Sequence, residues 1–380
     1  MVNPTGAGLG AHFADLADPR IDRTKLHRLI DILMIAICGV IGGAETWNDI
    51  EEWGRSKEGW LRGFLELPNG IPSHDTFRRV FCLLDPQQFQ ACFVSWIQSA
   101  YSVTGGQVIA IDGKTLRRSH DRTAGKAAIH MVSAWAAVNR VVLAQTKVDD
   151  KSNEITAVPE LLNVLELAGC IVTLDALGCQ KEFTRVIRAK RADYVLAVKK
   201  NQGHLYEDIK DLFDTEFEQA IPFEGIVHDY SQTIDKDHGR IEIRKCWTIS
   251  DQEYLKYVRN GDDWEGLSTI AVVRAERRYA DKREIEHRFY ISSLPGDASL
   301  LLRATRSHWG IENCVHWVLD VAFHEDDSRM RKDNSPQNFA ILRHIALNLI
   351  RQERTSKRSI KGKRLKAAWS ESYLLKALKG

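Results

Sequence analysis

Residues 22–102 carry apolar side chains at intervals of three and four, which is the spacing of helices that bury one face. Two long stretches of this kind, 26–41 and 47–67, end before the turn Pro68-Asn69-Gly70. Ser73 then predicts the N-cap of a helix over 74–84, and Pro86 opens another. The pattern predicts an all-helical N-terminal domain over residues 1–104.

The pattern changes after Gly105-Gly106, where short apolar runs alternate with helical ones. The order is β-β-β-α-β-α-β, with the two strands after the first forming a hairpin around Arg140. Asp112 ends the first strand and Asp175 ends the fourth. This order and these acids are typical of an α/β, RNase H-like core, in which a crossover helix returns parallel strands to one sheet. We expect the first part of that core at residues 105–203, with strands at 107–112, 130–139, 141–149, 170–177 and 193–200 and helices at 157–169 and 181–190.

Residues 204–296 contain a helical stretch followed by alternating runs at 239–249, 267–279 and 284–294, which predict an antiparallel, β-containing insertion. Two helices follow in 297–352, and the first of them carries Glu312. We assign these helices to the core and residues 353–380 to a basic C-terminal tail.

The overall charge says little about partners, because 53 Lys and Arg stand against 51 Asp and Glu. The charge is concentrated in residues 351–366, where Glu353 is the only acid in a run of basic residues. Such a run favours an anionic polymer, although solvated basic tails are also common. The start has no signal-peptide pattern, and the most apolar segment is too short to span a bilayer, so we expect a cytoplasmic protein with no membrane contact.

Three carboxylates carry the candidate chemistry: Asp112, Asp175 and Glu312. A carboxylate at the end of a buried strand is costly unless a positive partner compensates it, and a divalent metal is the usual partner of converging acids. Two Asp and one Glu suit Mg²⁺, with Mn²⁺ as a substitute, and a two-metal site implies phosphodiester chemistry. Taken singly, each Asp is also explained as a turn-capping acid.

The helix around Glu312 repeats polar side chains every four residues, at His308, Glu312, His316 and Asp320, so these side chains share one face. A zinc site made by His308, Glu312 and His316 is conceivable, but three ligands on consecutive turns would diverge. We favour Glu312 as a metal ligand, with His308 contacting phosphate or the Glu312 carboxylate.

Several polar and basic side chains are candidate DNA contacts. Lys114, Arg117 and Arg118 follow Asp112, and Lys199, Asn201 and Gln202 follow the fifth strand. Arg78 and Arg79 lie on a short helix that could be the second helix of a helix-turn-helix. Solvated basic positions are the alternative for each of these groups.

The motifs IAIDGKTLRRSHD, KSNEITAVPELL, VTLDALGCQKE, DYVLAVKKNQ and SHWGIEN resemble the DDE transposases of bacterial insertion sequences, and the nearest group is the H-repeat-associated, Rhs-linked family. The resemblance covers residues 22–352. It implies that Asp112, Asp175 and Glu312 are the catalytic, Mg²⁺-binding DDE triad. It also implies double-stranded DNA partners, namely terminal inverted repeats and target DNA, and we expect a homodimer in the DNA complex.

The wider superfamily carries a Tyr, Arg, Glu and Lys signature around its Glu, and this chain departs from it at Thr305, His308 and Leu319. Arg306, or His308 itself, can stand in for the missing Arg and contact DNA. The resemblance therefore implies a transposase that cuts element ends and joins them to target DNA. Two alternatives stay open: a metal nuclease without strand transfer, and a catalytically silent, DNA-binding relic.

Overall fold

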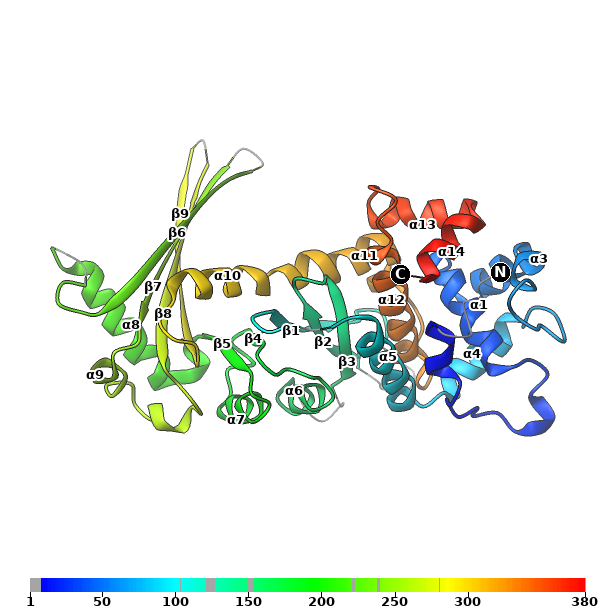
Figure 1. The fold of residues 1–380 in the computed structure, drawn as a ribbon, viewed down its shortest axis with the longest axis horizontal. Coiled ribbons are helices and arrows are strands. Elements are labelled where there is room, and N and C mark those ends of the chain that lie inside the picture. Colours follow the sequence, from blue (N-terminus) through cyan, green and yellow to red (C-terminus); the bar gives the residue numbers. More distant parts are fainter. Residues whose placement is uncertain are drawn as a thin grey trace.

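The computed structural model describes residues 8–102, 104–120, 127–148, 154–220, 223–237, 240–279 and 281–379. The molecule is elongated, with a nine-stranded sheet along its length and a helical lobe at one end (Figure 1). A long helix runs across one face of the sheet, between the lobe and the strands at the far end. Among the described residues, no helix combines the length and the apolar character that crossing a membrane requires.

The N-terminal region is helical, as the apolar spacing predicts. Ser73 caps α4 through a bond from the Thr76 N–H at 3.4 Å, and Asp85 caps α5 at the Gln87 and Gln88 N–H groups. The stretch predicted as one helix over 47–67 is interrupted at Lys57, which separates α2 from α3. The elements are η1 (Leu9–Phe13), η2 (Asp22–Thr24), α1 (Leu29–Ile41), α2 (Trp47–Ser56), α3 (Glu58–Leu61), α4 (His74–Leu83) and α5 (Pro86–Ala100).

The central strands have the predicted RNase H-like arrangement. β1 pairs antiparallel with β2 and parallel with β4, so the strand order in this part of the sheet is β3-β2-β1-β4-β5. The elements are β1 (Val108–Thr115), β2 (His130–Ala136), β3 (Val141–Lys147), α6 (Glu154–Asn163), β4 (Ile171–Leu174), α7 (Lys181–Ala189) and β5 (Asp193–Val198). The predicted fold class is confirmed.

The insertion extends this sheet, because β9 pairs antiparallel with β5 and the order continues β5-β9-β8-β7-β6. We call strands β6–β9 the β extension; their far ends project beyond the long helix (Figure 1). β6 was not foreseen, because its residues HDYSQTIDKD show little apolar alternation. The elements are η3 (Lys200–Gln202), α8 (Gly203–Glu218), β6 (His228–Asp237), β7 (Arg240–Ile249), α9 (Gln252–Leu255), η4 (Gly261–Asp263), β8 (Thr269–Arg278) and β9 (Arg283–Ser292).

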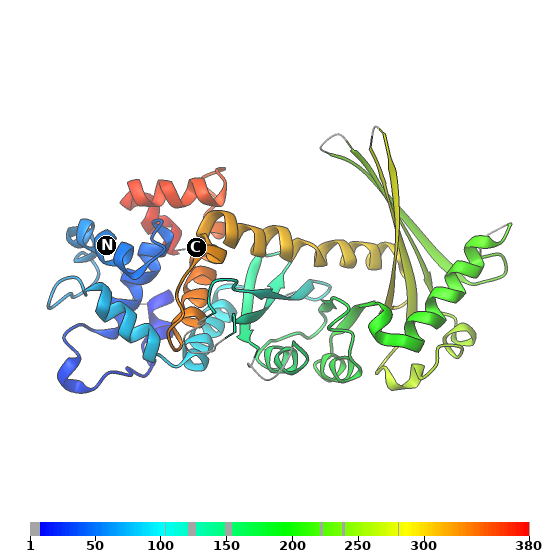
Figure 2. The ribbon, with the colours of Figure 1, turned by 180° about the vertical axis from the view of Figure 1, so that it is seen from behind.

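The long helix consists of α10 (Ala298–His308), a π-helical turn at Glu312–His316, and α11 (Trp317–Phe323), and it is followed by η6 (Glu325–Asp327). It crosses β1, β4 and β5 on one face of the sheet, while α6 and α7 lie on the opposite face (Figure 2). Its polar face is therefore held over the strands that carry Asp112 and Asp175.

Helix α12 (Ser335–Gln352) joins the sheet to the helical lobe. The Asn348 side chain accepts a bond from the Val142 N–H at 2.9 Å and donates one to the Val142 carbonyl at 2.8 Å, which satisfies the outer edge of β3. The buried Asn338 amide donates to the carbonyls of Phe81 and Leu84 at the end of α4. The Asn348 amide thus ties α12 to the edge of the sheet, and the Asn338 Nδ2 group ties α12 to α4 in the lobe.

Residues of the expected basic tail are folded. They form α13 (Ile360–Trp369) and α14 (Glu371–Lys379), which pack against α12 and complete the helical lobe. Arg364 is buried, donates to the Val40 carbonyl at 2.9 Å and to the Ala322 carbonyl, and stacks on Phe323. It therefore joins the carboxyl ends of α1 and α11, where cations are favoured. Apolar side chains such as Leu374 explain why this basic segment does not stay in solvent.

Candidate active site

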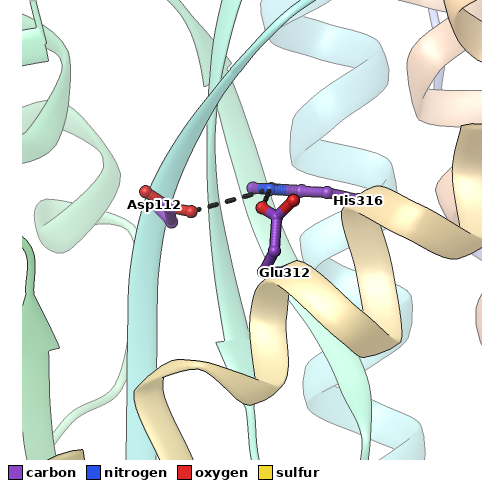
Figure 3. A group of neighbouring side chains, drawn as sticks. All are labelled: Asp112, Glu312 and His316. Atoms are coloured by element: carbon purple, nitrogen blue, oxygen red, sulfur yellow. Dashed lines mark hydrogen bonds and ion pairs between the residues drawn. The ribbon is translucent and has the colours of Figure 1, made fainter. Parts of the chain in front are cut away.

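Asp112 lies where β1 leaves the core, after four buried residues from Val108 to Ile111. Its side chain faces the long helix and is 26% exposed. On the helix, Glu312 and His316 point toward it (Figure 3). His316 Nδ1 lies 3.0 Å from Glu312 Oε2 and 3.6 Å from Asp112 Oδ2, so the imidazole bridges the two carboxylates.

The π-helical turn contains both Glu312 and His316. One such turn inserts an extra residue in the helical ladder and is frequent at functional sites. His316 is buried, whereas Glu312 is 57% exposed. The turn thus presents the carboxylate toward solvent and keeps the imidazole against the sheet.

Asp175 follows β4 and is engaged in its own loop. Its Oδ1 accepts the N–H groups of Leu177 at 3.0 Å and Gly178 at 3.2 Å. The loop is held from outside by Asn201, whose amide donates to the Ala176 carbonyl at 2.7 Å, and by Gln202, whose amide donates to the Cys179 carbonyl. Asn201 and Gln202 therefore act as supports of the Asp175 loop in this structure.

Asp112, Asp175 and Glu312 all line one open cavity of about 870 Å³. Its walls come from the ends of β4 and β5, from β9 and from the long helix. Trp309 is 50% exposed at its rim, and the Arg288 guanidinium stacks on the indole at 4.5 Å. The cavity is large enough to admit part of a polymer next to the acids.

The residues Asp112, Glu312 and His316 fit a divalent cation. Each of the three side chains offers one ligand atom, and these three atoms lie within 4.8 Å of one another. No other such group of His, Cys, Asp or Glu side chains occurs within the described part of the chain. The buried His316 Nε2 has no hydrogen-bond partner among the described residues. Asp175 lines the same cavity but is outside this group. The alternative zinc set does not converge, because His308 Nδ1 lies 3.0 Å from the Thr173 hydroxyl instead.

Burial raises the pKa of Asp112 to about 6, while the His316 imidazole opposes this shift and the Asp175 carboxylate adds to it. The negative charge of the carboxylates at this site is therefore only partly compensated by neighbouring protein groups. Burial also lowers the pKa of His308 to about 4, so this imidazole is neutral at pH 7.

We expect Asp112→Asn to stabilise the metal-free protein at pH 7.5. The folded-state pKa of Asp112 lies above its unfolded value, so the folded state loses stability as pH rises from about 4 to about 6. A pKa shift of this size lowers the free energy of unfolding by about 2–3 kcal/mol at pH 7.5, and the uncharged Asn side chain avoids this loss. Thermal unfolding in EDTA at pH 4.5 and 7.5 measures the effect. An Asn variant with unchanged stability at pH 7.5 would contradict it.

The predicted basic contacts lie in different settings. Lys114 is only 12% exposed, and its ammonium lies 2.7 Å from Asp320, 3.2 Å from Glu325 and 3.1 Å from Asp326. These carboxylates outweigh the effect of burial and raise the pKa of Lys114. The Lys114 ammonium is thus paired with carboxylates of the protein itself and is not available to a DNA phosphate in this structure.

The remaining candidates are at least partly accessible. Arg117 and Arg118 pair with Asp326 at 3.1 Å and with Asp327 at 3.4 Å, and Arg306 pairs with Asp235 at 3.0 Å. Lys199 is exposed at the cavity. On α4, Arg78 pairs with Asp75 at 2.8 Å, and Arg79 is exposed.

The sequence predicted His316 as a ligand only within the disfavoured zinc set, although the four-residue repeat placed it on the face of Glu312. The repeat was also the signal for Asp320, which holds Lys114. The helix face that carries this repeat packs across two strands. His308 contacts Thr173 on β4, while His316 contacts Asp112 and Asp320 contacts Lys114, both on β1. The repeat therefore indicates a docking face as well as a ligand set.

Comparison with known proteins identifies the family. Residues 104–349 match the transposase DDE domain, and residues 10–97 match the DDE_Tnp_1-associated domain. The chain is 38% identical to the H repeat-associated putative transposase YhhI of Escherichia coli (strain K12), covering 97% of each chain. It is 40% identical to the putative transposase YncI of Escherichia coli O157:H7, covering 93% of this chain and 89% of that one.

Among solved structures, the piggyBac transposase synaptic complex with hairpin DNA is similar over 95% of this chain and 76% of that chain, with 11% identity and a TM-score of 0.42. The family match covers most of the chain and agrees with the resemblance of its motifs. This chain therefore belongs to the family of the transposase DDE domain and carries the N-terminal domain associated with it.

Proposed function

We propose that this protein is a DNA transposase that cleaves the ends of an insertion sequence and joins them to target DNA. The observation that supports this most directly is the convergence of Asp112 and Glu312 at one cavity, with Asp175 on the same wall. These acids come from separate elements of an RNase H-like core in a chain of the transposase DDE family.

Asp112, Asp175 and Glu312 would hold the divalent ions, Mg²⁺ or Mn²⁺, with His316 as a further candidate ligand. When bound, such ions supply an activated attacking oxygen and charge stabilisation for the leaving oxygen of a phosphodiester. His316 orients Glu312 toward Asp112 through its Nδ1 contacts. Asn201 and Gln202 hold the loop in which Asp175 sits.

The DNA would approach the open side of the cavity. Lys199 at the end of β5 and Arg117 beyond β1 are exposed cations on this route and can neutralise backbone phosphates. The neutral His308 imidazole is held on Thr173 and does not add charge there. An element has two ends, so we infer that a homodimer forms in the DNA complex and supplies one site for each end.

The test is a cleavage and strand-transfer assay on the full chain. The substrate is labelled duplex carrying the inverted repeats that flank the gene, incubated with Mg²⁺, with Mn²⁺ or with EDTA. We expect metal-dependent cleavage at the repeat ends, and joining of a pre-cut 3′-hydroxyl end to a plasmid. Cleavage without joining would favour the nuclease alternative. Binding without cleavage in either metal would favour the silent relic.

A further inference from the structure

A second groove, of about 470 Å³, lies between the helical lobe and the segment that follows α11. Helices α2 and α4 form one wall, and residues 324–335 form much of the other. The lining includes five Arg or Lys residues against two acids, Glu45 and Asp327. The cations are Arg78, Arg329, Arg331, Lys332 and the buried Arg343. We call this feature the cationic groove.

Two of these cations have no partner among the residues that the structure describes. Arg329 and Lys332 are exposed, and neither side chain forms an ion pair or hydrogen bond with the described residues. Three cations of the β8–β9 hairpin are arranged differently: Arg278 pairs with Glu276, Lys282 with Glu284, and Arg288 with Glu286. Unpaired positive charge at the groove is thus available to an external anion, whereas much of the charge on the β extension is internally compensated.

The groove is linked to the segment that follows β1, the strand of Asp112. Arg117 and Arg118, just beyond β1, pair with Asp326 and Asp327, and Asp327 lines the groove. The Arg331 guanidinium donates to the Arg118 carbonyl at 3.1 Å. Basic side chains, with Asp326 and Asp327 among them, therefore extend from the segment after β1, over residues 326–332, to Arg78 on α4.

We propose that the cationic groove binds the phosphate backbone of duplex DNA between the acidic site and helix α4, with Arg329 and Lys332 as direct phosphate contacts. The proposal rests on the proposed function. The cations lie in succession along an extended segment of an open groove, which suits the repeated charges of a polymer. Unpaired Arg and Lys side chains gain most from such charges, because neutralising phosphates releases condensed counterions.

The test compares the full chain with the double variant Arg329→Ala/Lys332→Ala. Binding of a labelled 30-base-pair duplex of unrelated sequence is measured by fluorescence anisotropy in EDTA, from low salt upward. We expect the slope of log affinity against log salt to fall by about 1.8, and affinity at 0.1 M salt to fall by at least about tenfold. Circular dichroism should show an unchanged fold, because neither side chain has a partner in the described part of the chain.

The matched control is Lys210→Ala/Lys256→Ala, which removes the same charge from α8 and from the residue after α9, away from the helical lobe (Figure 1). The control should keep the slope of the unaltered chain within about half a unit. The proposal is overturned if both double variants behave alike, or if the unaltered chain does not bind duplex at low salt. Because the assay contains no metal, a protein that binds through this groove but never cleaves would support this inference while contradicting the transposase proposal.

Discussion

Asp112→Asn, Asp175→Asn and Glu312→Gln are each expected to lower metal-dependent strand cleavage by about three orders of magnitude or more. Each change removes a negative ligand from the proposed ion site and leaves the shape of the side chain. A loss of about 4 kcal/mol in transition-state stabilisation corresponds to this rate effect. The Asn side chain can still accept the N–H bonds of the Asp175 loop, so the loop should keep its conformation.

Cleavage is measured on duplex with the element ends in Mg²⁺, and DNA affinity is measured in EDTA, where the variants should bind like the unaltered chain. Asp211→Asn and Glu253→Gln serve as matched controls, because both acids are exposed on the insertion, away from the cavity. The controls should keep full cleavage. A triad variant that cleaves at the rate of the unaltered chain would remove that residue from the assignment.

Lys114→Met is expected to destabilise the protein by about 3–5 kcal/mol, the usual cost of removing one partner of a buried charge pair. The Lys114 ammonium is shared by Asp320, Glu325 and Asp326, and Glu325 is only 2% exposed. Without the lysine, Glu325 keeps Arg343 at 3.6 Å as a cationic partner, and the junction between β1 and the end of α11 carries excess negative charge.

Urea unfolding of Lys114→Met and of Arg117→Met separates the two possible roles of these cations. Arg117 is 79% exposed, so its pair with Asp326 should contribute less than about 1 kcal/mol. If Lys114 instead served as a phosphate contact, its variant would unfold normally and show a reduced salt slope of DNA binding. That result would show that the ion pairs of Lys114 with the three carboxylates do not stabilise the fold.

Much of the architecture could be predicted because its signals are local. The change from three-and-four spacing to short apolar runs after Gly105-Gly106 marked the start of the core, and the predicted N-cap at Ser73 acts within three residues. Strand β6 was not predicted, because a polar strand at the edge of a sheet lacks the apolar alternation that identifies strands. The C-terminal helices were predicted as a basic tail because the burial of Arg364 depends on carbonyls more than 40 residues away.

The sequence by itself determined most of the elements, their order and the three acids that could converge, because apolar spacing and carboxylates at strand ends are properties of neighbouring residues. Tertiary structure decided the partners. It placed His316 between Asp112 and Glu312, and it enclosed Lys114 among acids some 200 positions further along. The interaction of a charged group depends on which helix docks over its strand, and that docking follows from packing of the whole sheet and lobe rather than from any local pattern.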